Sequence, residues 1–354
     1  MKKVQHHSFF KPNPFGHGGE RRTTQIIEHY KENGFEIESV LLKPSYHFKL
    51  QYFLKSFLLI KNAYGLFRWS SARNFFTWWK YLYLIYPSLE KSFSTGTELF
   101  IWESTSDFFY FLPYFAKKMG KKVHAYPHNI ESLVKGHKST ITAKNAPNGY
   151  LFEINTYKIC DKLFSISIFD HQLFLLFNIN SEFFPYHPPK ELKLYLNSIK
   201  KLRKNLPEKN SKIKHYLIAG TVHNHPTKLG MEMLINWLIN NPQHNCKFTV
   251  AGYGTEMFKN VIKNDNIEVL GTLSHEEMEN TMIHCDALLV NHIPTTGILT
   301  RVIEFNTAGI PVVINNEAAY SFLGMSGIHV FTAFESITDL QISHFNKLQE
   351  NKVL

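Results

Sequence analysis

The stretch VNHIPTTGILTRVIEFNTAGIPVVIN, residues 290–315, decides the fold. An apolar run that begins at Ala287 ends in a loop containing Gly297, and apolar residues then return at helical spacing. Gly309 ends this predicted helix of residues 298–308, and the β-branched run Pro311–Ile314 starts another strand. The order strand, loop, helix, strand is the repeating unit of a parallel α/β sheet.

Two charged residues of this helix carry its functional signal. Arg301 and Glu304 are three positions apart, so they share one helix face. A loop that follows a parallel strand and opens a helix lies at the carboxyl edge of the sheet, where N–H groups bind phosphate. One cation for a phosphate and one carboxylate for ribose hydroxyls suit a sugar nucleotide. The alternative is an exposed ion pair, which contributes little.

Eight residues of the stretch resemble the donor-binding signature of GT-B glycosyltransferases of the retaining, glycogen-synthase-like superfamily: Thr295, Thr296, Gly297, Arg301, Glu304, Gly309, Pro311 and Val312. Many of those enzymes carry two glutamates on this helix, and here Thr296 stands in place of the first. The resemblance implies a catalytic role for Arg301 and Glu304. It implies donor contacts at Thr295, Thr296, Gly297 and Ile298.

Composition narrows the class of protein. The 354 residues suffice for two domains, and 44% hydrophobic with 19% charged residues is typical of a globular chain. The net charge of +10 indicates an anionic partner: a nucleotide sugar, an anionic membrane face or a nucleic acid. No basic and aromatic nucleic-acid module is visible, so we expect no nucleic-acid partner. The cysteines, Cys160, Cys246 and Cys285, form no CxxC pair and favour a reducing compartment.

Localisation is predicted as cytoplasmic, either free or at the inner face of the membrane. The first residues lack the apolar run of a signal peptide, and no apolar stretch is long enough to span a bilayer. Residues 46–92 are rich in aromatics, and Lys or Arg interrupts them at helical intervals. Such a segment either packs as two core helices or lies on anionic lipid, where it would collect a lipid-linked acceptor. Both interpretations stay open.

A glycine-containing loop follows the first predicted strand, Val4–Phe10. Its sequence is FGHGGERR, and a helix is predicted from Glu20 to Asn33. The loop is either a plain tight turn or an anion site, since the full GxGxxG spacing is absent. The matching loop of GT-B enzymes lies beside the donor phosphates and the acceptor. The resemblance therefore implies donor contacts at Gly18 and Gly19 and acceptor contacts at Glu20 and Arg21.

The motif HNIE follows the predicted strand Val123–Tyr126. It resembles a motif at the acceptor edge of the first GT-B domain. The resemblance implies that His128 faces the anomeric centre and that Asn129 and Glu131 lie on the acceptor side. A lone histidine is more often structural than catalytic. Glu153, Asp161 and Ser167, further on, are expected to cap and orient.

The second half alternates strands with helices, which predicts another parallel sheet. Strands are expected at 215–220, 247–252, 267–271, 287–292 and 310–315, and helices at 229–241, 256–264, 275–285 and 298–308. Glycines at successive strand ends indicate an open crevice on one edge. The expected donor contacts there are Gly220, Thr221, Gly252, Gly254 and Gly271, and Lys228 resembles the family's donor-phosphate cation.

The predicted fold is α/β, with two doubly wound Rossmann-like domains facing across a cleft. Residues 1–185 form the acceptor-side domain, 186–212 a basic connection, 213–335 the nucleotide-sugar domain and 336–354 a final helix. The expected function is a glycosyltransferase, in particular a hexosyltransferase, which moves a sugar from a UDP or GDP type donor to a glycan or lipid-linked acceptor in cell-surface polysaccharide assembly.

The expected chemistry needs no metal and no other cofactor, because Arg301 and Lys228 supply positive charge and the chain has no DxD pattern. The resemblance implies retention of configuration. The alternatives are a sugar-nucleotide epimerase-like enzyme and a GT-B membrane-surface scaffold that has lost its chemistry.

Overall fold

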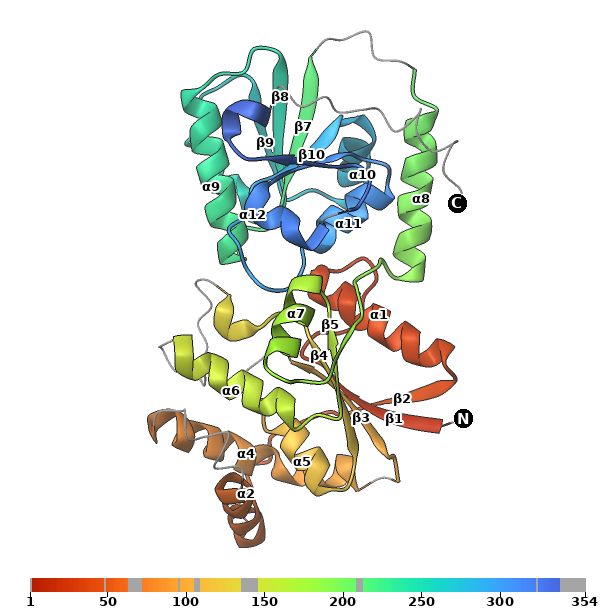
Figure 1. Cartoon of the computed structure of the whole chain (residues 1–354), viewed down its shortest axis with the longest axis vertical. Helices are drawn as coiled ribbons and strands as arrows, with labels where there is room; N and C mark the ends of the chain where they lie inside the picture. The colour runs from red at the N-terminus through yellow and green to blue at the C-terminus, as the bar shows by residue number, and fades with distance from the viewer. Residues whose placement is uncertain are drawn as a thin grey trace. The chain divides into compact units, whose positions relative to one another are not determined.

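The computed structural model describes residues 2–47, 49–62, 72–94, 96–104, 109–134, 146–207, 213–322 and 324–337. It divides into two compact units (Figure 1). The first unit comprises Met1–Pro189 together with Thr296–Ile298, and the second comprises Lys190–Thr295 and the chain from Leu299 onward.

The first unit is built on a parallel sheet of six strands in the order β2-β1-β3-β4-β5-β6. The strands are β1 (Lys2–His7), β2 (Phe35–Ser39), β3 (Leu99–Ser104), β4 (Lys122–Pro127), β5 (Lys162–Ser165) and β6 (Ser181–Phe183). The helices are α1 (Gly18–Glu32), α2 (Leu50–Asn62), α4 (Ala72–Phe93), α5 (Leu112–Lys118), α6 (Ala146–Lys158) and α7 (Ile168–Leu176), with the 3-10 helix η2 (Glu131–Leu133).

Helices cover both faces of this sheet, with α1 on one side and α5 and α6 on the other (Figure 1). Strand β3 is therefore buried over nearly its whole length, as a central parallel strand must be. Phe100 and Trp102 join the larger apolar cluster with α4 and α5, whereas Ile101 packs on the opposite face under Ile26 of α1. The alternation of side chains along one strand thus supplies two cores.

The second unit holds another parallel six-stranded sheet, in the order β12-β11-β10-β7-β8-β9. Its strands are β7 (Lys214–Ala219), β8 (Cys246–Ala251), β9 (Ile267–Gly271), β10 (Ala287–Val290), β11 (Val312–Asn315) and β12 (Ile328–Phe331). Its helices are α8 (Lys190–Lys204), α9 (His225–Asn240), α10 (His275–His284), α11 (Thr300–Thr307) and α12 (Asn316–Ala319), with the 3-10 helices η3 (Thr255–Phe258), η4 (Tyr320–Phe322) and η5 (Phe334–Ile337).

The deciding stretch folds as predicted within this sheet. Strands β10 and β11 are fully buried neighbours, and α11 joins them with Gly309 just beyond its end. Gly309 has a φ of +72°, which ends the helix in the left-handed conformation. Helix α9 lies on one side of the sheet and α8, α10 and α11 on the other (Figure 1).

Two predicted segments differ in the structure. The expected basic connection of residues 186–212 contains α8, which buries Leu192, Leu196 and Ile199 in the second unit, and the division falls after Pro189. Most of its lysines are exposed on the face opposite these apolar residues. The helix predicted at 256–264 is only the short η3, because Gly254 at its start has a φ of +82° and turns follow Phe258. Of the final helix expected at 336–354, all but Ser336 and Ile337 lies outside the described residues.

Candidate active site

In the second unit, glycines crowd the carboxyl edge of the sheet at the ends of β7, β8 and β9. Gly252 has a φ of +127°, and a Cβ placed on it would lie 2.0 Å from the carbonyl oxygen of Gly220. The Gly252 amide also donates to the carbonyl of Gly271 at 2.8 Å. The backbones of neighbouring strand ends therefore meet with no room for side chains, which leaves peptide groups lining this edge.

Arg301 of α11 reaches the same edge. A Cβ on Gly220 would lie 3.4 Å from Nη1 of Arg301 and 2.8 Å from Cγ2 of Thr227 in the first turn of α9. The guanidinium thus lies close to the first strand end and to the amino end of a helix of 16 residues. Partial positive charge at a helix amino end and a guanidinium both favour an anion.

Three buried polar atoms along the loop from β10 into α11 have no hydrogen-bond partner among the residues that the structure describes: Nε2 of His292, Oγ1 of Thr295 and Nε of Arg301. Burial lowers the pKa of His292 to about 3, with Arg301 as the next cause, so this imidazole is neutral at pH 7. Burial also lowers the pKa of Arg301 to about 10, against the opposing charge of Glu304. Unpaired buried polar atoms are costly, and several in one loop indicate a ligand that would satisfy them.

Glu304 lies one turn after Arg301 on α11 and is buried, with 4% of its surface exposed. Arg301 and Glu304 therefore do not form the exposed surface pair that was the alternative from sequence. Gly254 follows Gly252 in the loop after β8, and Val222, next to Thr221, donates its amide to the carbonyl of Tyr253 at 3.1 Å. The loops after β7 and β8 are pinned to each other by this bond.

Lys228 takes a different position from the strand-end residues. It lies on α9, and its amine contacts Glu232 one turn later at 3.7 Å. The side chain is about one third exposed, so this pair is weak and the amine is readily reoriented. Whether it contacts a donor phosphate stays a prediction.

In the first unit, the predicted acceptor residue Glu20 has a structural bond. Its carboxylate accepts from the amide of His17 at 3.0 Å, and the His17 ring accepts from Gly19 at 3.1 Å, which closes a capping box at the start of α1. A Cβ on Gly19 would lie 2.5 Å from the Phe10 ring. Gly18 and Arg21 belong to the same first turn of α1.

Three of the predicted donor residues, Thr296, Gly297 and Ile298, group with the first unit. The Thr296 hydroxyl accepts from the Ile130 amide at 2.9 Å, and the Gly297 amide donates to Asp170 at 2.9 Å. Gly297 has a φ of +80°, and a Cβ on it would lie 2.0 Å from Oδ1 of Asn129. The structure therefore brings Gly297 together with Asn129, which was predicted on the acceptor side.

His128 belongs to a buried cluster around Glu103, the next-to-last residue of β3. Nε2 of His128 lies 2.6 Å from Oε2 of Glu103, and Nε2 of His6 lies 2.6 Å from Oε1. The Thr23 hydroxyl donates to Oε2 at 2.7 Å. Burial acts to raise the pKa of Glu103, but the hydrogen bonds from His128 and His6 outweigh it and hold the pKa well below its ordinary value.

The residues expected to cap and orient do so. Glu153 accepts from the amides of Glu131 at 3.0 Å and Ser132 at 2.7 Å, so it fixes the turn that follows His128. Asp161 accepts from the Val123 amide at 2.7 Å. Ser167 caps α7 by accepting from the Asp170 amide at 3.0 Å.

The sequence patterns did not predict several polar residues of these clusters, chiefly Glu103, His6, Thr23 and His292. A signal was present for two of them. Glu103 ends the apolar run LFIWE, and His292 ends an apolar run before a loop. A polar residue at the carboxyl end of a buried parallel strand is placed at the ligand edge of the sheet.

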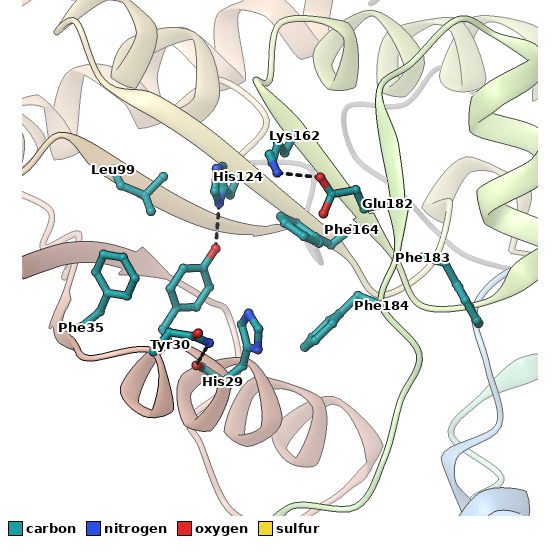
Figure 2. A pocket seen from close by; sticks show the side chains of 11 residues that line it. His29, Tyr30, Phe35, Leu99, His124, Lys162, Phe164, Glu182, Phe183 and Phe184 are labelled. Atoms are coloured by element: carbon teal, nitrogen blue, oxygen red, sulfur yellow. Dashed lines mark hydrogen bonds and ion pairs between the residues drawn. The ribbon is translucent and has the colours of Figure 1, made fainter.

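The described part of the first unit also contains a pocket of about 460 Å³ at the opposite, amino edge of its sheet (Figure 2). Phe35, Phe164 and Phe184 form apolar walls, and the Tyr30 hydroxyl lies 2.8 Å from Nδ1 of His124. None of the predicted site residues lines it. The pocket is therefore separate from the polar clusters described above.

Solved structures identify the fold. The catalytic domain of starch synthase IV from Arabidopsis thaliana, bound to ADP and acarbose, matches with a TM-score of 0.60 at 9% identity, over 99% of this chain and 93% of that one. Sucrose-phosphate synthase from Thermosynechococcus elongatus matches with 0.58 at 11% identity, over 96% and 88%. Anabaena HepE in complex with UDP and glucose matches with 0.55 at 13% identity, over 94% and 86%.

These likenesses show that the chain has the GT-B fold, which confirms the predicted fold class. No protein-family model and no curated protein sequence matches the chain. Among the described residues, no helix is both long and apolar enough to cross a bilayer. The same residues contain no group of three or more His, Cys, Asp or Glu side chains arranged to hold a metal ion.

Proposed function

We propose that the protein is a glycosyltransferase that uses a nucleoside diphosphate sugar as its donor. The observation that carries the proposal is the half-buried Arg301, beside Gly220 and the amino end of α9, whose buried Nε has no hydrogen-bond partner among the described residues. A diphosphate would satisfy this donor, and the same positive charge would stabilise the diphosphate as the glycosidic bond breaks. The neighbours with nucleotides bound, starch synthase IV with ADP and HepE with UDP, support it.

Each of the other site residues has a proposed part. Glu304 would accept from the ribose hydroxyls, and the peptide groups at Gly220 and Gly252 would lie against the nucleotide. His128 would contact the transferred sugar. Since Arg301 supplies the charge that a divalent ion would otherwise supply, we propose a metal-independent reaction, and the resemblance of the Arg301 helix supports retention of configuration.

Donor binding is the first test. A thermal-shift screen would compare UDP, GDP, ADP and CMP and their common sugars, because a ligand at a hundredfold excess over its Kd stabilises by about 2.7 kcal/mol. We expect one nucleoside diphosphate to raise the unfolding temperature of the wild type. Arg301→Gln and Glu304→Ala should weaken its binding by about tenfold to a hundredfold, the cost of one hydrogen bond to a charged group.

The control is Lys247→Gln, which removes an exposed cation from β8 and should leave the shift intact. If folded Arg301→Gln binds the nucleoside diphosphate with unchanged affinity, the assignment of the donor site is wrong. Following the bound sugar nucleotide by chromatography separates the remaining alternatives. Slow release of free sugar supports a transferase, an isomerised sugar nucleotide would show an epimerase, and no binding would favour a scaffold.

The acceptor we propose is a glycan or lipid-linked molecule of cell-surface polysaccharide assembly, collected at an anionic membrane face. The support is α2, where Leu50, Leu54, Phe57 and Leu58 are each 46–60% exposed. Their spacing places them on one side of the helix, while Leu59 and Ile60 face the core. Exposed Lys49 and Lys61 flank this stripe, an arrangement typical of interfacial helices.

Vesicle flotation tests this surface. The wild type should float with vesicles containing phosphatidylglycerol and much less with neutral phosphatidylcholine. Leu54→Gln with Leu58→Gln should reduce flotation. The matched control is Leu194→Gln with Leu202→Gln, which changes two leucines of α8 that are 72% and 47% exposed. Equal flotation of both double variants, or no flotation of the wild type, would show that the stripe does not bind membrane.

A further inference from the structure

The Glu103 cluster draws on four separate elements of the first unit. Glu103 lies on β3, His6 on β1, Thr23 on α1 and His128 in the loop after β4. The Glu103 side chain is fully buried, and its two histidine partners are 5% and 8% exposed. A buried carboxylate is costly unless its oxygens accept hydrogen bonds, and here three donors converge on it.

The hydrogen-bond directions in this cluster follow from the carboxylate. An ionised carboxylate only accepts, so Nε2 of His128 and Nε2 of His6 must each carry a proton and donate to Glu103. Thr23 donates its only hydroxyl proton to Oε2, so the Ser8 hydroxyl, 3.0 Å away, must donate to Thr23. Ser8 in turn accepts from the amide of Phe10 at 3.1 Å. Each hydrogen bond in this series therefore has one possible direction, and the series ends on Glu103.

This direction fixes the chemistry that His128 offers to a ligand. With Nε2 committed to Glu103, a neutral His128 has its proton on Nε2 and a lone pair on Nδ1. Nδ1 has no partner in the described part of the chain and is not among its buried unpaired atoms. It can therefore accept a hydrogen bond from outside the cluster. The other tautomer, with the proton on Nδ1, would set a nitrogen lone pair against the carboxylate and is excluded.

We propose that Glu103 is a positioning residue that holds His128 in the Nε2–H tautomer, so that Nδ1 accepts a hydrogen bond from a sugar hydroxyl. The ligand class is thus a neutral polyol group. This inference rests on the proposed glycosyltransferase function. It adds a residue that contacts no substrate and acts only through His128, as the partner of a ligand histidine sets its tautomer and orientation.

The experiment reads the tautomer directly on the full-length chain. NMR of protein labelled with ¹⁵N in the histidine rings distinguishes a protonated from an unprotonated ring nitrogen, and His128→Gln assigns the signals. In the wild type at pH 7.5 we expect Nε2 of His128 protonated and Nδ1 unprotonated. In Glu103→Gln the side-chain amide accepts on one atom only, so its NH2 group must face Nε2 of one histidine, and we expect protonation to appear on Nδ1 of His128 or of His6.

Thr23→Val is the matched control, since it removes a donor from the same Oε2 and leaves both histidine bonds in place. A purely structural cluster would lose stability in both variants with no change of tautomer. We expect the tautomer to change only in Glu103→Gln. If that variant does not fold, Glu103→Asp, whose carboxylate is withdrawn by one methylene, is measured in the same way.

Kinetics provide the second readout. Glu103→Gln should lower turnover of the sugar nucleotide on the order of a hundredfold through the misplaced His128, with unchanged affinity for the nucleoside diphosphate. Wild-type Nδ1 found protonated, or wild-type signals in the Glu103 variants, would overturn the role of Glu103. Failure of every nucleotide to bind would overturn the proposed function instead, and the tautomer measurement would still stand.

Discussion

At the scale of single residues, the second-unit edge depends on glycines whose backbones touch. Gly252 combines a φ of +127° with a carbonyl oxygen that lies 2.0 Å from the position of a Cβ. Both features oppose any side chain, and they act separately. Gly324 shows the first feature alone, with a φ of +83° and no atom of the described residues within 4 Å of its Cβ position.

We therefore expect Gly324→Ala to cost about 1 kcal/mol, the penalty of the left-handed conformation, and Gly252→Ala to cost about 3 kcal/mol or more. Gly252→Ala should also weaken nucleotide binding, because the shift falls at the strand end beside Gly220. Urea unfolding and the thermal-shift screen measure both effects. Equal costs for the two variants would show that the backbone contact is relieved without strain.

The sequence predicted some of these residues and not others for a physical reason. Arg301, Glu304 and Gly309 are placed by spacing within one helix, which is a local property of the chain. The pairing of His6 with Glu103 joins residues 97 positions apart and depends on which strands become neighbours. That order is a property of the whole sheet, so the Glu103 cluster could not be predicted by spacing.

At the scale of elements, α8 is a helix whose high content of basic residues made its sequence look like an exposed connection. Nine lysines and arginines in residues 190–214 indicated an exposed connection. The buried positions Leu192, Leu196 and Ile199 repeat at helical spacing, and this periodicity decides the outcome. The helix also ties another element in place. Nη1 of Arg203 donates to the carbonyls of Met282, Ile283 and Cys285, at 2.7–2.8 Å, where α10 ends.

Arg203→Met should destabilise the second unit by about 2 kcal/mol, because it leaves carbonyls at a helix end without their charged donor. Lys201→Met, on an exposed position of the same helix turn, is the control and should change stability by less than about 0.5 kcal/mol. The free energy of unfolding from urea titration is the measurement. A cost for Arg203→Met no larger than the control's would mean that water replaces the guanidinium at these carbonyls.

At the scale of the whole molecule, each unit has an apolar core of its own. Ile101 is fully buried in the first, and Leu289 is 1% exposed in the second. Such chains commonly depart from two-state unfolding. We expect two calorimetric transitions. Ile101→Ala should lower the temperature of one transition and Leu289→Ala that of the other. Each substitution should reduce the free energy of unfolding of its own unit by about 2–5 kcal/mol.

Adding the donor nucleotide shows which transition belongs to which unit, because it should raise the temperature of only the transition that Leu289→Ala lowers. A single transition that both substitutions shift equally would show that the units unfold together.

The alternation of strands and helices predicted both sheets, because periodicity is a local property of the sequence. The boundary after Pro189 was missed because it depends on which core receives the apolar face of α8.

The strand orders also bear on synthesis at the ribosome. In the first sheet, β3, β4, β5 and β6 are added one after another along the same edge, so each emerging strand finds its partner already in place. In the second, β7 is central, and the chain first extends one edge through β8 and β9 and then returns to build the other. In both sheets the first strand keeps an unpaired edge until the chain returns to it, β1 until β3 has been made and β7 until β10 has been made, but β7 waits while two further strands are added to its other edge and β1 while only one is.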